Sequence, residues 1–376
     1  MKILFISSWF PNKLEPTNGN FVQRHAEAVA LLHDVEILHA IGDNNQKEEF
    51  IFDDKIINDI RTLIIYYKNS SNPVVNFLRR MKAYKMGFSN VQKPDVVHAN
   101  VLHNTMLFAV YLKKKYKIPF VVSEHWSALQ KNNLFKTAHT VKIIAKYIAR
   151  NANYILPVSN NLKDSLQFLG VRTPMKVIPN VVDTHLFLSK SEANSIFIFL
   201  HISNLIPGKN ADRIINVAIK LLKQGYDFNL QIGGDGDISK LNRIVQKENL
   251  EQKIKIFGIQ TLPQVADRMH HSDCFILFSD YENQPCVIAE AFASGIRVIS
   301  TNVGGVSEFF PENFGILLEK PSEDLLEKAM ISMLENNISY DRKELANYAK
   351  NTFSKEVVGR IFVKIYDEVI TKNVQL

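Results

Sequence analysis

Cysteine is almost absent from this sequence. The 376 residues contain only Cys274 and Cys286. Neither lies at a metal-ligand spacing from another Cys or from a His, which argues against a zinc site built on cysteine. Two cysteines also argue against a disulfide-rich scaffold. Such low cysteine usage fits a reducing compartment, so we expect a cytoplasmic protein.

Long hydrophobic runs are missing as well. No stretch approaches the ~20 consecutive apolar residues that a membrane-spanning helix needs. The first residues, MKILFISSWFPN, hold one lysine and a short apolar run that meets Trp9, so they predict a buried strand and not a signal peptide. A hydrophobic content of 46% is ordinary for a globular protein, and 376 residues suit two domains.

Acidic residues are scarce in the N-terminal half alone. Residues 1–190 hold 25 Lys and Arg against 14 Asp and Glu, a net charge of +11, whereas the remainder holds 20 against 24, a net charge of −4. Two basic amphipathic segments, FLRRMKAYKMGF (77–88) and TVKIIAKYIAR (140–150), belong to this half. The asymmetry favours an anionic membrane surface or another polyanion as a partner, and lysines that only solubilise the surface are the alternative. No nucleic-acid motif with stacking aromatics is present, so we expect no nucleic-acid partner.

Apolar strand-like runs alternate with amphipathic helical runs throughout the chain. KILFIS, DVEILHA, RTLIIYY, DVVHAN and PFVVSEH follow this order in the first half, and IFIFLHIS (196–203) restarts the pattern in the second. Buried strands separated by helices predict parallel sheets covered on both faces. We therefore expect an α/β fold of two Rossmann-like, doubly wound domains, at 1–187 and 195–353, joined by a linker near 188–194. A final amphipathic helix is expected at about 355–376.

The segment DYENQPCVIAEAFASGIRVISTNVGGVSE (280–308) carries the clearest site pattern. A helix predicted to begin at Pro285, directly after the buried strand CFILFS, presents its first N–H groups at the carboxyl edge of a sheet, which is an anion site. Glu290, further along that helix, can accept hydrogen bonds from ribose hydroxyls, and Glu282 faces the group beyond the phosphates. Two acceptors that flank a phosphate site predict a nucleotide-sugar pocket.

Other candidate residues follow other predicted strands. Lys209 stands where a helix begins after IFIFLHIS and can neutralise a diphosphate. Gly19, in the long loop after the first strand, and Gly234, in the turn IGGDGD, allow a ligand to approach the backbone closely. His125 is the last residue of PFVVSEH and is expected to point into the crevice at the sheet edge. An ordinary turn glycine and a structural histidine are the alternatives.

The run ENQPCVIAEAFASGIRVISTNVGGVSE resembles the donor-site signature of the retaining glycosyltransferases of family 4, which have the two-domain GT-B fold. The segments SSWFPN, TNGNFVQRHAEAVA, VVSEHWS, ILPVS, KVIPNVVD, SNLIPGKN and IGGDGD extend the resemblance, in order, over nearly the whole chain. The resemblance implies transfer of a sugar from a UDP- or GDP-linked donor, without a metal or other cofactor. It also implies that the final helix crosses back to the first domain.

Site roles follow from the resemblance and from the strand-end positions. The catalytic residues are expected to be His125, Glu282 and Lys209. The acceptor side is expected to include His98, His103, Glu124 and Trp126. The donor site is expected to consist of Gly19, Asn204, Lys209, Gly234, Phe257, Gly258, Glu282, Asn283, Gln284, Pro285, Cys286, Val287 and Glu290.

The chain departs from the family pattern at three of these positions. Asn204 stands where the family has an arginine that clamps the diphosphate together with the lysine five residues later. Asn283 and Pro285 replace family glycines, so the identity of the sugar cannot be transferred. We expect a glycan or lipid-linked oligosaccharide acceptor, in the synthesis of capsule, O-antigen or exopolysaccharide at the cytoplasmic face of the inner membrane. The alternative is a non-catalytic, nucleotide-sugar-binding regulatory subunit on the same scaffold.

Overall fold

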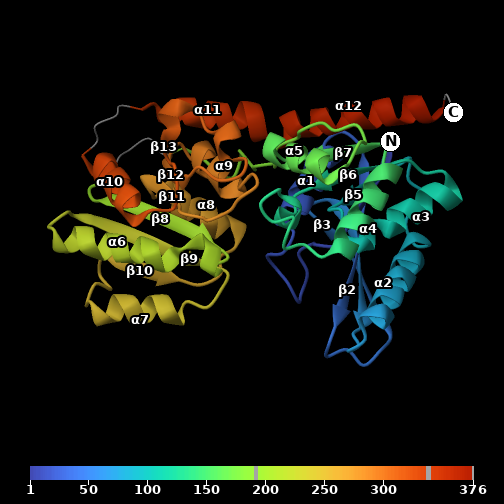
Figure 1. The fold of residues 1–376 in the computed structure, drawn as a ribbon, viewed down its shortest axis with the longest axis horizontal. Coiled ribbons are helices and arrows are strands. Elements are labelled where there is room, and N and C mark those ends of the chain that lie inside the picture. Colours follow the sequence, from blue (N-terminus) through green and yellow to red (C-terminus); the bar gives the residue numbers. More distant parts are fainter. Residues whose placement is uncertain (190–193, 336–339, 375–376) are drawn as a thin grey trace. The chain divides into compact units, whose positions relative to one another are not determined.

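The computed structural model describes residues 1–189, 194–335 and 340–374. They form two compact units, each built around one sheet (Figure 1). Unit 1 consists of Met1–Val181 together with Lys355–Leu376, and unit 2 consists of Val182–Ser354. Residues 190–193 of the predicted linker lie outside the described residues.

The sheet of unit 1 has seven strands in the order β3-β4-β2-β1-β5-β6-β7. Every neighbouring pair is parallel except β3 and β4. The strands are β1 (Lys2–Ser7), β2 (Asp34–Asp43), β3 (Phe50–Ile57), β4 (Ile60–Lys68), β5 (Val96–Asn100), β6 (Phe120–Glu124) and β7 (Tyr154–Pro157).

Strand β3 is absent from the predicted pattern. It pairs antiparallel with β4 through a turn at Asn58 and Asp59, whose φ angles are 49° and 63°. Its sequence FIFDDKII is half-buried or exposed along its whole length, because it forms the edge of the sheet. The expected parallel order is therefore wrong at this edge, and the Asn-Asp turn was the only local signal for the hairpin.

Helices cover both faces of this sheet. Leu4 and Ile6 of β1 pack with side chains of four helices on one face, whereas Ile3 and Phe5 pack with two helices on the other. This alternation follows from the two-residue period of a strand. The first four helices are α2 (Pro73–Phe88), α3 (Leu107–Tyr116), α4 (His139–Asn151) and α5 (Asn160–Leu169), and the other two are α1 (Asn20–Ala30) and α12 (Lys355–Val374).

Helix α12 completes unit 1 because α1 alone leaves part of one face of the sheet uncovered. Gly359 lets the two helices approach closely, since a Cβ at this position would lie 2.3 Å from the carbonyl oxygen of Ala28. Lys355 pairs with Glu27 of α1 at 2.9 Å. The apolar stripe of α12 that packs on the sheet consists of Val358, Phe362, Ile365, Tyr366 and Val369.

The sheet of unit 2 has six parallel strands in the order β10-β9-β8-β11-β12-β13. The strands are β8 (Phe197–Ser203), β9 (Phe228–Gly234), β10 (Ile254–Phe257), β11 (Cys274–Leu277), β12 (Arg297–Thr301) and β13 (Gly315–Leu318). One face packs on α6 (Ala211–Lys223), α7 (Ser239–Lys247) and α10 (Glu323–Leu334), and the other packs on α8 (Leu262–His270), α9 (Cys286–Ala293) and α11 (Arg342–Phe353).

Both sheets reverse their strand order once. The reversal lies between β1 and β5 in unit 1 and between β8 and β11 in unit 2. The chain segments after such a pair of strands lead away in opposite directions, and open α/β sheets bind ligands at this place. Within the described ranges no helix is long and apolar enough to cross a bilayer.

Candidate active site

The two segments at the strand-order reversal of unit 2 are joined by hydrogen bonds. The Asp280 N–H, after β11, donates to the carbonyl oxygen of Gly208, after β8, at 2.9 Å. Asn210 Nδ2 donates to the carbonyl oxygen of Phe278 at 2.9 Å and to Asp280 Oδ1 at 2.8 Å. These bonds hold the two predicted donor segments at one edge of the sheet. Asn210 and Asp280 were missed from the sequence. Asp280 comes shortly after strand β11, and Asn210 comes after the turn that follows β8.

The cation and the carboxylate predicted for this site contact each other. Lys209 Nζ lies 2.5 Å from Glu282 Oε1, and the two side chains are only 16% and 9% exposed. An ammonium has three donors, so Lys209 can bind a phosphate oxygen while it still donates to Glu282. The structure therefore brings together two of the three predicted catalytic residues.

Helix α9 begins one residue later than predicted, at Cys286. Pro285 precedes it in an extended conformation, with φ −71° and ψ 121°. A helix of eight residues still carries partial positive charge at its N-terminus, where the first N–H groups have no acceptor within the helix. Glu290 is 2% exposed and lies one turn after Cys286. Helical side chains lean towards the N-terminus, so this carboxylate is oriented towards the same end.

The intervening donor-site residues occupy the loop that leads into α9 and the first turn of that helix. Asn283 and Val287 are half-buried, whereas Gln284 is buried. The carbonyl oxygen of Asn283 accepts a hydrogen bond from the Gly305 N–H at 3.0 Å, which ties this loop to the segment after β12. The glutamate segment therefore forms one connected structure with its neighbours.

The glycines at the end of β9 are explained by neighbouring backbone. A Cβ on Gly234, whose φ is 134°, would lie 1.9 Å from the carbonyl oxygen of Ser203. A Cβ on Gly233 would lie 2.0 Å from the carbonyl oxygen of Phe257. Close packing of three strand ends is therefore sufficient to require glycine here, and no ligand is needed to account for it.

Three other predicted donor residues surround that edge. Asn204 is exposed directly after β8. The Phe257 ring is covered on one side by the Arg268 guanidinium, 3.8 Å from the ring centroid. A Cβ on Gly258 would meet open space, with no atom within 4 Å, so the backbone of Gly258 can be reached from outside.

In unit 1, Gly19 precedes α1 with a φ of 75°. A Cβ there would lie 2.3 Å from the carbonyl oxygen of Trp9, so the loop after β1 folds back onto Gly19. Both the left-handed conformation and this contact require glycine.

His98 lies inside unit 1. Its Nδ1 is 2.6 Å from the Tyr366 hydroxyl of α12, and its Nε2 is 2.7 Å from Ser123 Oγ. The ring stacks on Phe5 at a centroid distance of 4.3 Å, and no part of the residue is exposed. These contacts make His98 part of the core, in contrast to the acceptor-side position that we expected.

Glu124 is also buried, and its carboxylate holds two loops together. Oε2 accepts from the Leu102 N–H at 2.6 Å, and Oε1 accepts from the N–H groups of His125 and Trp126 at 2.8 and 2.6 Å. Burial raises the pKa of Glu124 to about 7, although the three N–H donors oppose the rise. Val101, directly before Leu102, has a φ of 69°, which is rare for a β-branched residue. The predicted acceptor-side carboxylate therefore fixes the loops after β5 and β6.

Those loops carry a cluster of aromatic rings. The Trp126 ring is edge-to-face with the rings of His103 and Trp9, at centroid distances of 5.8 and 6.1 Å. His125 lies 4.0 Å from Phe21 and belongs to the same sheet edge. Burial lowers the pKa of His103 to about 4 and that of His125 well below its usual value, so both rings are neutral at pH 7. Trp9 and Phe21 were missed from the sequence, because only tertiary structure brings them to these loops.

No group of three or more His, Cys, Asp or Glu side chains that could hold a metal ion occurs within residues 1–189, 194–335 and 340–374.

Comparison with known proteins supports the same architecture over the whole chain. A structure of sucrose-phosphate synthase from Thermosynechococcus elongatus superposes with a TM-score of 0.79 at 16% identity, and covers 99% of this chain and 100% of that chain. The HepE protein of Anabaena, determined in complex with UDP-glucose, superposes with a TM-score of 0.75 at 16% identity over 98% of this chain and 100% of that chain. Identities this low show the fold alone.

Sequence relatives agree with the structural ones. An uncharacterized glycosyltransferase of Methanocaldococcus jannaschii is 26% identical over 98% of this chain and 99% of the relative. A human phosphatidylinositol N-acetylglucosaminyltransferase subunit is 28% identical over 60% of this chain, which spans 48% of that protein. Residues 19–186 match the family description Glycosyltransferase Family 4, and residues 187–352 match Glycosyl transferases group 1. The chain therefore belongs to the family 4 glycosyltransferases and has their two-domain GT-B fold.

Proposed function

We propose that this protein is a retaining glycosyltransferase that moves a sugar from a UDP- or GDP-linked donor to a glycan or lipid-linked acceptor. The observation that carries the proposal is the pair formed by Lys209 and Glu282 where the strand order of unit 2 reverses, with Glu282 on the loop that leads into α9. A mostly buried ammonium next to a helix N-terminus suits a diphosphate.

In this proposal the diphosphate binds Lys209 Nζ and the N-terminal end of α9, and the Glu290 carboxylate accepts from the ribose hydroxyls. The bond between the anomeric carbon and the phosphate oxygen breaks, so negative charge grows on the departing nucleoside diphosphate. Positive groups that are already in place stabilise this charge without further reorganisation. Glu282 holds Lys209 ready in this way.

The acceptor oxygen forms the new bond to the anomeric carbon on the face that the diphosphate leaves, and its proton passes to the departing diphosphate. The family resemblance supports this retaining course. His125 is neutral at pH 7 because its pKa is lowered by burial, so it suits a hydrogen bond to a sugar hydroxyl and not the role of a cation. We infer that the reaction needs no divalent metal, because Lys209 and α9 supply the positive charge. Activity in excess EDTA is the corresponding test.

A membrane lipid as acceptor is supported by one group of relatives. The human relative is named a phosphatidylinositol N-acetylglucosaminyltransferase subunit, and that name describes the transfer of a sugar to a phospholipid. Together with the basic half of the chain, this favours a lipid-linked acceptor at the cytoplasmic face of a membrane. The synthesis of capsule, O-antigen or exopolysaccharide is the setting that we propose.

Thermal unfolding with a panel of nucleotide-sugars tests donor binding. A donor at 100 times its dissociation constant adds about 2.7 kcal/mol to the free energy of unfolding, which raises the melting temperature measurably. We expect one UDP- or GDP-sugar to do so with the wild type, and we expect the same concentration to stabilise Lys209→Ala and Glu290→Ala by half as much or less. A panel in which no member stabilises the wild type contradicts the proposal.

A non-catalytic nucleotide-sugar-binding protein is the second candidate. Asn204 favours it, because the arginine expected at this exposed position after β8 is missing. The two candidates differ in turnover. A donor that stabilises the protein but is neither hydrolysed nor transferred, with any acceptor tested, identifies the non-catalytic form.

A further inference from the structure

One stretch of unit 1 has a surface of a single charge sign. Residues 96–163 contain ten Lys and Arg and one acidic residue, Glu124. That carboxylate is completely buried and accepts three backbone N–H bonds, so it does not offset the positive surface. The exposed cations of the stretch are Lys114, Lys115, Lys117, Lys131, Lys136 and Arg150.

Lysines that merely solubilise a surface are usually mixed with acids. Unit 2 shows that arrangement, since Lys220 pairs with Glu327 at 2.7 Å and Lys240 pairs with Asp212 at 2.5 Å. Over the part of the chain that the structure describes, none of the ten cations of residues 96–163 forms an ion pair with a carboxylate. Positive charge on this stretch is therefore left for an external anion.

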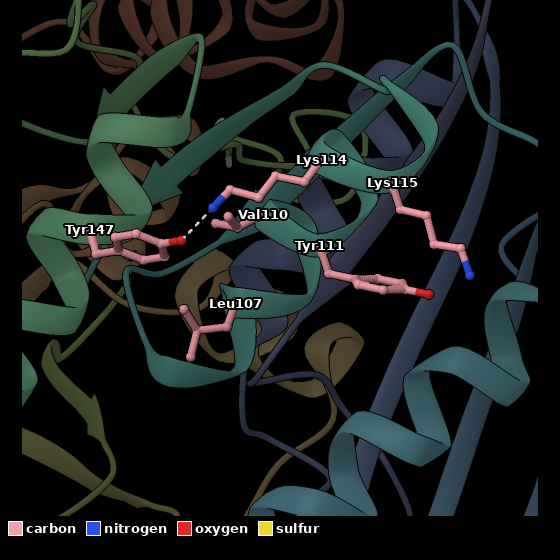
Figure 2. A pocket seen from close by; sticks show the side chains of 6 residues that line it. All are labelled: Leu107, Val110, Tyr111, Lys114, Lys115 and Tyr147. Carbon is pink, nitrogen blue, oxygen red and sulfur yellow. Dashed lines mark hydrogen bonds between the residues drawn. The ribbon is translucent and has the colours of Figure 1, made fainter.

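The same stretch contains an apolar groove between α3 and α4 (Figure 2). The groove has a volume of about 410 Å³. Lys114 Nζ donates to the Tyr147 hydroxyl across it at 2.7 Å, which Figure 2 draws as a dashed line. The groove is lined by Leu107, Val110, Tyr111, Lys114, Lys115 and Tyr147.

Apolar exposure continues on both sides of the groove. Ile143 is 50% exposed and lies one turn before Tyr147, so the two side chains share a face of α4. Tyr116 is 39% exposed, and Lys115 Nζ lies 5.2 Å from its ring centroid. We call the groove together with Tyr116, Lys117 and Ile143 the α3–α4 face. It combines an aliphatic floor, tyrosine hydroxyls and an outer layer of ammonium groups.

We propose that the α3–α4 face docks this protein on a bilayer that contains anionic phospholipid. The ammonium groups meet the lipid phosphates, and the tyrosines with Ile143 enter the boundary between headgroups and acyl chains. A nucleic acid or another soluble polyanion satisfies the cations but leaves Ile143 and the aliphatic floor without a partner, so the bilayer accounts for more of the face. The inference deepens the proposed function, because it places the protein where a lipid-linked acceptor occurs.

Flotation with vesicles tests the proposal. The two vesicle types are phosphatidylcholine alone and phosphatidylcholine mixed with phosphatidylglycerol, both at low salt. We expect the full chain to float with the mixed vesicles only. The triple variant Lys114→Gln/Lys115→Gln/Lys117→Gln is expected to bind them about 100-fold more weakly, because each surface lysine contributes roughly a factor of five.

Two further variants separate the outcomes. Lys247→Gln/Lys328→Gln/Lys350→Gln makes the same charge change at exposed positions of unit 2 and is expected to float like the wild type. Ile143→Ser keeps the charge and is expected to weaken binding about five-fold. Two outcomes overturn the proposal. In one, both triple variants float equally. In the other, the wild type binds heparin in preference to the mixed vesicles, and Ile143→Ser binds the vesicles as well as the wild type does. Donor stabilisation measured on the same samples is expected to be unchanged, so a failure of docking is distinguished from a failure of the proposed function.

Discussion

The pair Lys209–Glu282 gives opposite predictions for its two members. If the Lys209 ammonium binds the donor diphosphate, Lys209→Met removes a charge-assisted hydrogen bond worth about 1.5–3 kcal/mol. The affinity for UDP or GDP should then fall about 10- to 100-fold.

Glu282→Gln removes a negative charge that lies 2.5 Å from the same ammonium. A carboxylate roughly 6 Å from a phosphate repels it by about 3 kcal/mol at an effective dielectric constant of about 20. Loss of the contact that positions Lys209 offsets part of this gain. Nucleoside diphosphate should therefore bind Glu282→Gln as tightly as the wild type, or up to about ten-fold more tightly.

Stability responds differently from affinity. Each single variant leaves the other charge in a site where the side chains are only 16% and 9% exposed. We expect the free energy of unfolding to fall by about 2–4 kcal/mol in each, somewhat less than for a fully buried pair. The double variant removes both charges and should recover part of that loss.

Isothermal titration with UDP and GDP, together with urea unfolding, measures both effects. The matched control is Lys220→Met with Glu327→Gln, a 2.7 Å pair between α6 and α10, in which the lysine is 56% exposed. The control should lose at most about 1 kcal/mol and should leave nucleotide affinity unchanged. Wild-type affinity in Lys209→Met, or an equal loss of affinity in both single variants, would refute a role of this ammonium in diphosphate binding.

Three further predictions concern other parts of the molecule. Asn204→Arg should strengthen UDP or GDP binding about ten-fold, because it restores a charged fork beside the site. Glu124→Gln should lower the free energy of unfolding, measured in urea, by about 2–4 kcal/mol, since its NH₂ group must face at least one of the three N–H donors. Acid should destabilise unit 1, because burial lowers the pKa values of five histidines, which keeps them neutral in the folded state at a pH where the unfolded chain binds protons: His25, His39, His98, His103 and His125.

The sign of the acid effect follows from the proton count. Unfolded histidines bind protons near pH 6.5, so their stabilising contribution is present above pH 6.5 and is lost as the pH falls towards 4. Glu124 acts in the opposite direction, since its folded pKa is raised to about 7 and its contribution is lost as the pH rises through that value. Near pH 5.5 the unfolded chain thus binds more protons than the folded chain, so stability should fall as the pH falls. Urea unfolding between pH 5 and 6 measures this slope, and a flat profile contradicts it.

The predictions for Glu124→Gln and Asn204→Arg each have a matched control. Glu48→Gln, at an exposed position of unit 1, should change stability by less than about 0.5 kcal/mol. An effect this small in Glu124→Gln would mean that its carboxylate does not hold the loops. Asn204→Gln adds length without charge and should not raise nucleotide affinity, so a gain equal to that of Asn204→Arg would exclude the electrostatic explanation.

Much of the fold could be predicted because its strands are buried on both faces. Runs such as KILFIS and CFILFS are apolar at every position or nearly so, and they became β1 and β11. Strand β3 has only one partner, and Asp53, Asp54 and Lys55 interrupt its apolar residues, so hydrophobicity did not reveal it. The return of α12 to unit 1 came from the family resemblance, and its physical reason is the apolar stripe that covers the face beside α1.

Candidate site residues were harder to assign than strands. Position after a strand predicted that Lys209 and Glu282 lie at the same sheet edge, but their mutual contact depends on how two loops pack. His98 and Glu124 also lie near the ends of strands, in unit 1. The His98 ring, however, contacts the hydroxyl of Tyr366, which is far away in the sequence. The Glu124 carboxylate accepts a hydrogen bond from a backbone N–H group of a neighbouring loop. Sequence position indicates where a strand ends and does not indicate which partner its last side chains meet.

Turnover of nucleotide-sugars tests the central claim most directly. Purified protein is incubated with a panel of UDP- and GDP-sugars, with and without lipid-linked acceptors. Released nucleoside diphosphate and the glycosylated product are measured by mass spectrometry, and the anomeric configuration of the product is determined by NMR. We predict release from one donor by the wild type, retention of the anomeric configuration in the product, and loss of both signals in Lys209→Ala and Glu290→Ala. Release that persists unchanged in these two variants would contradict the account.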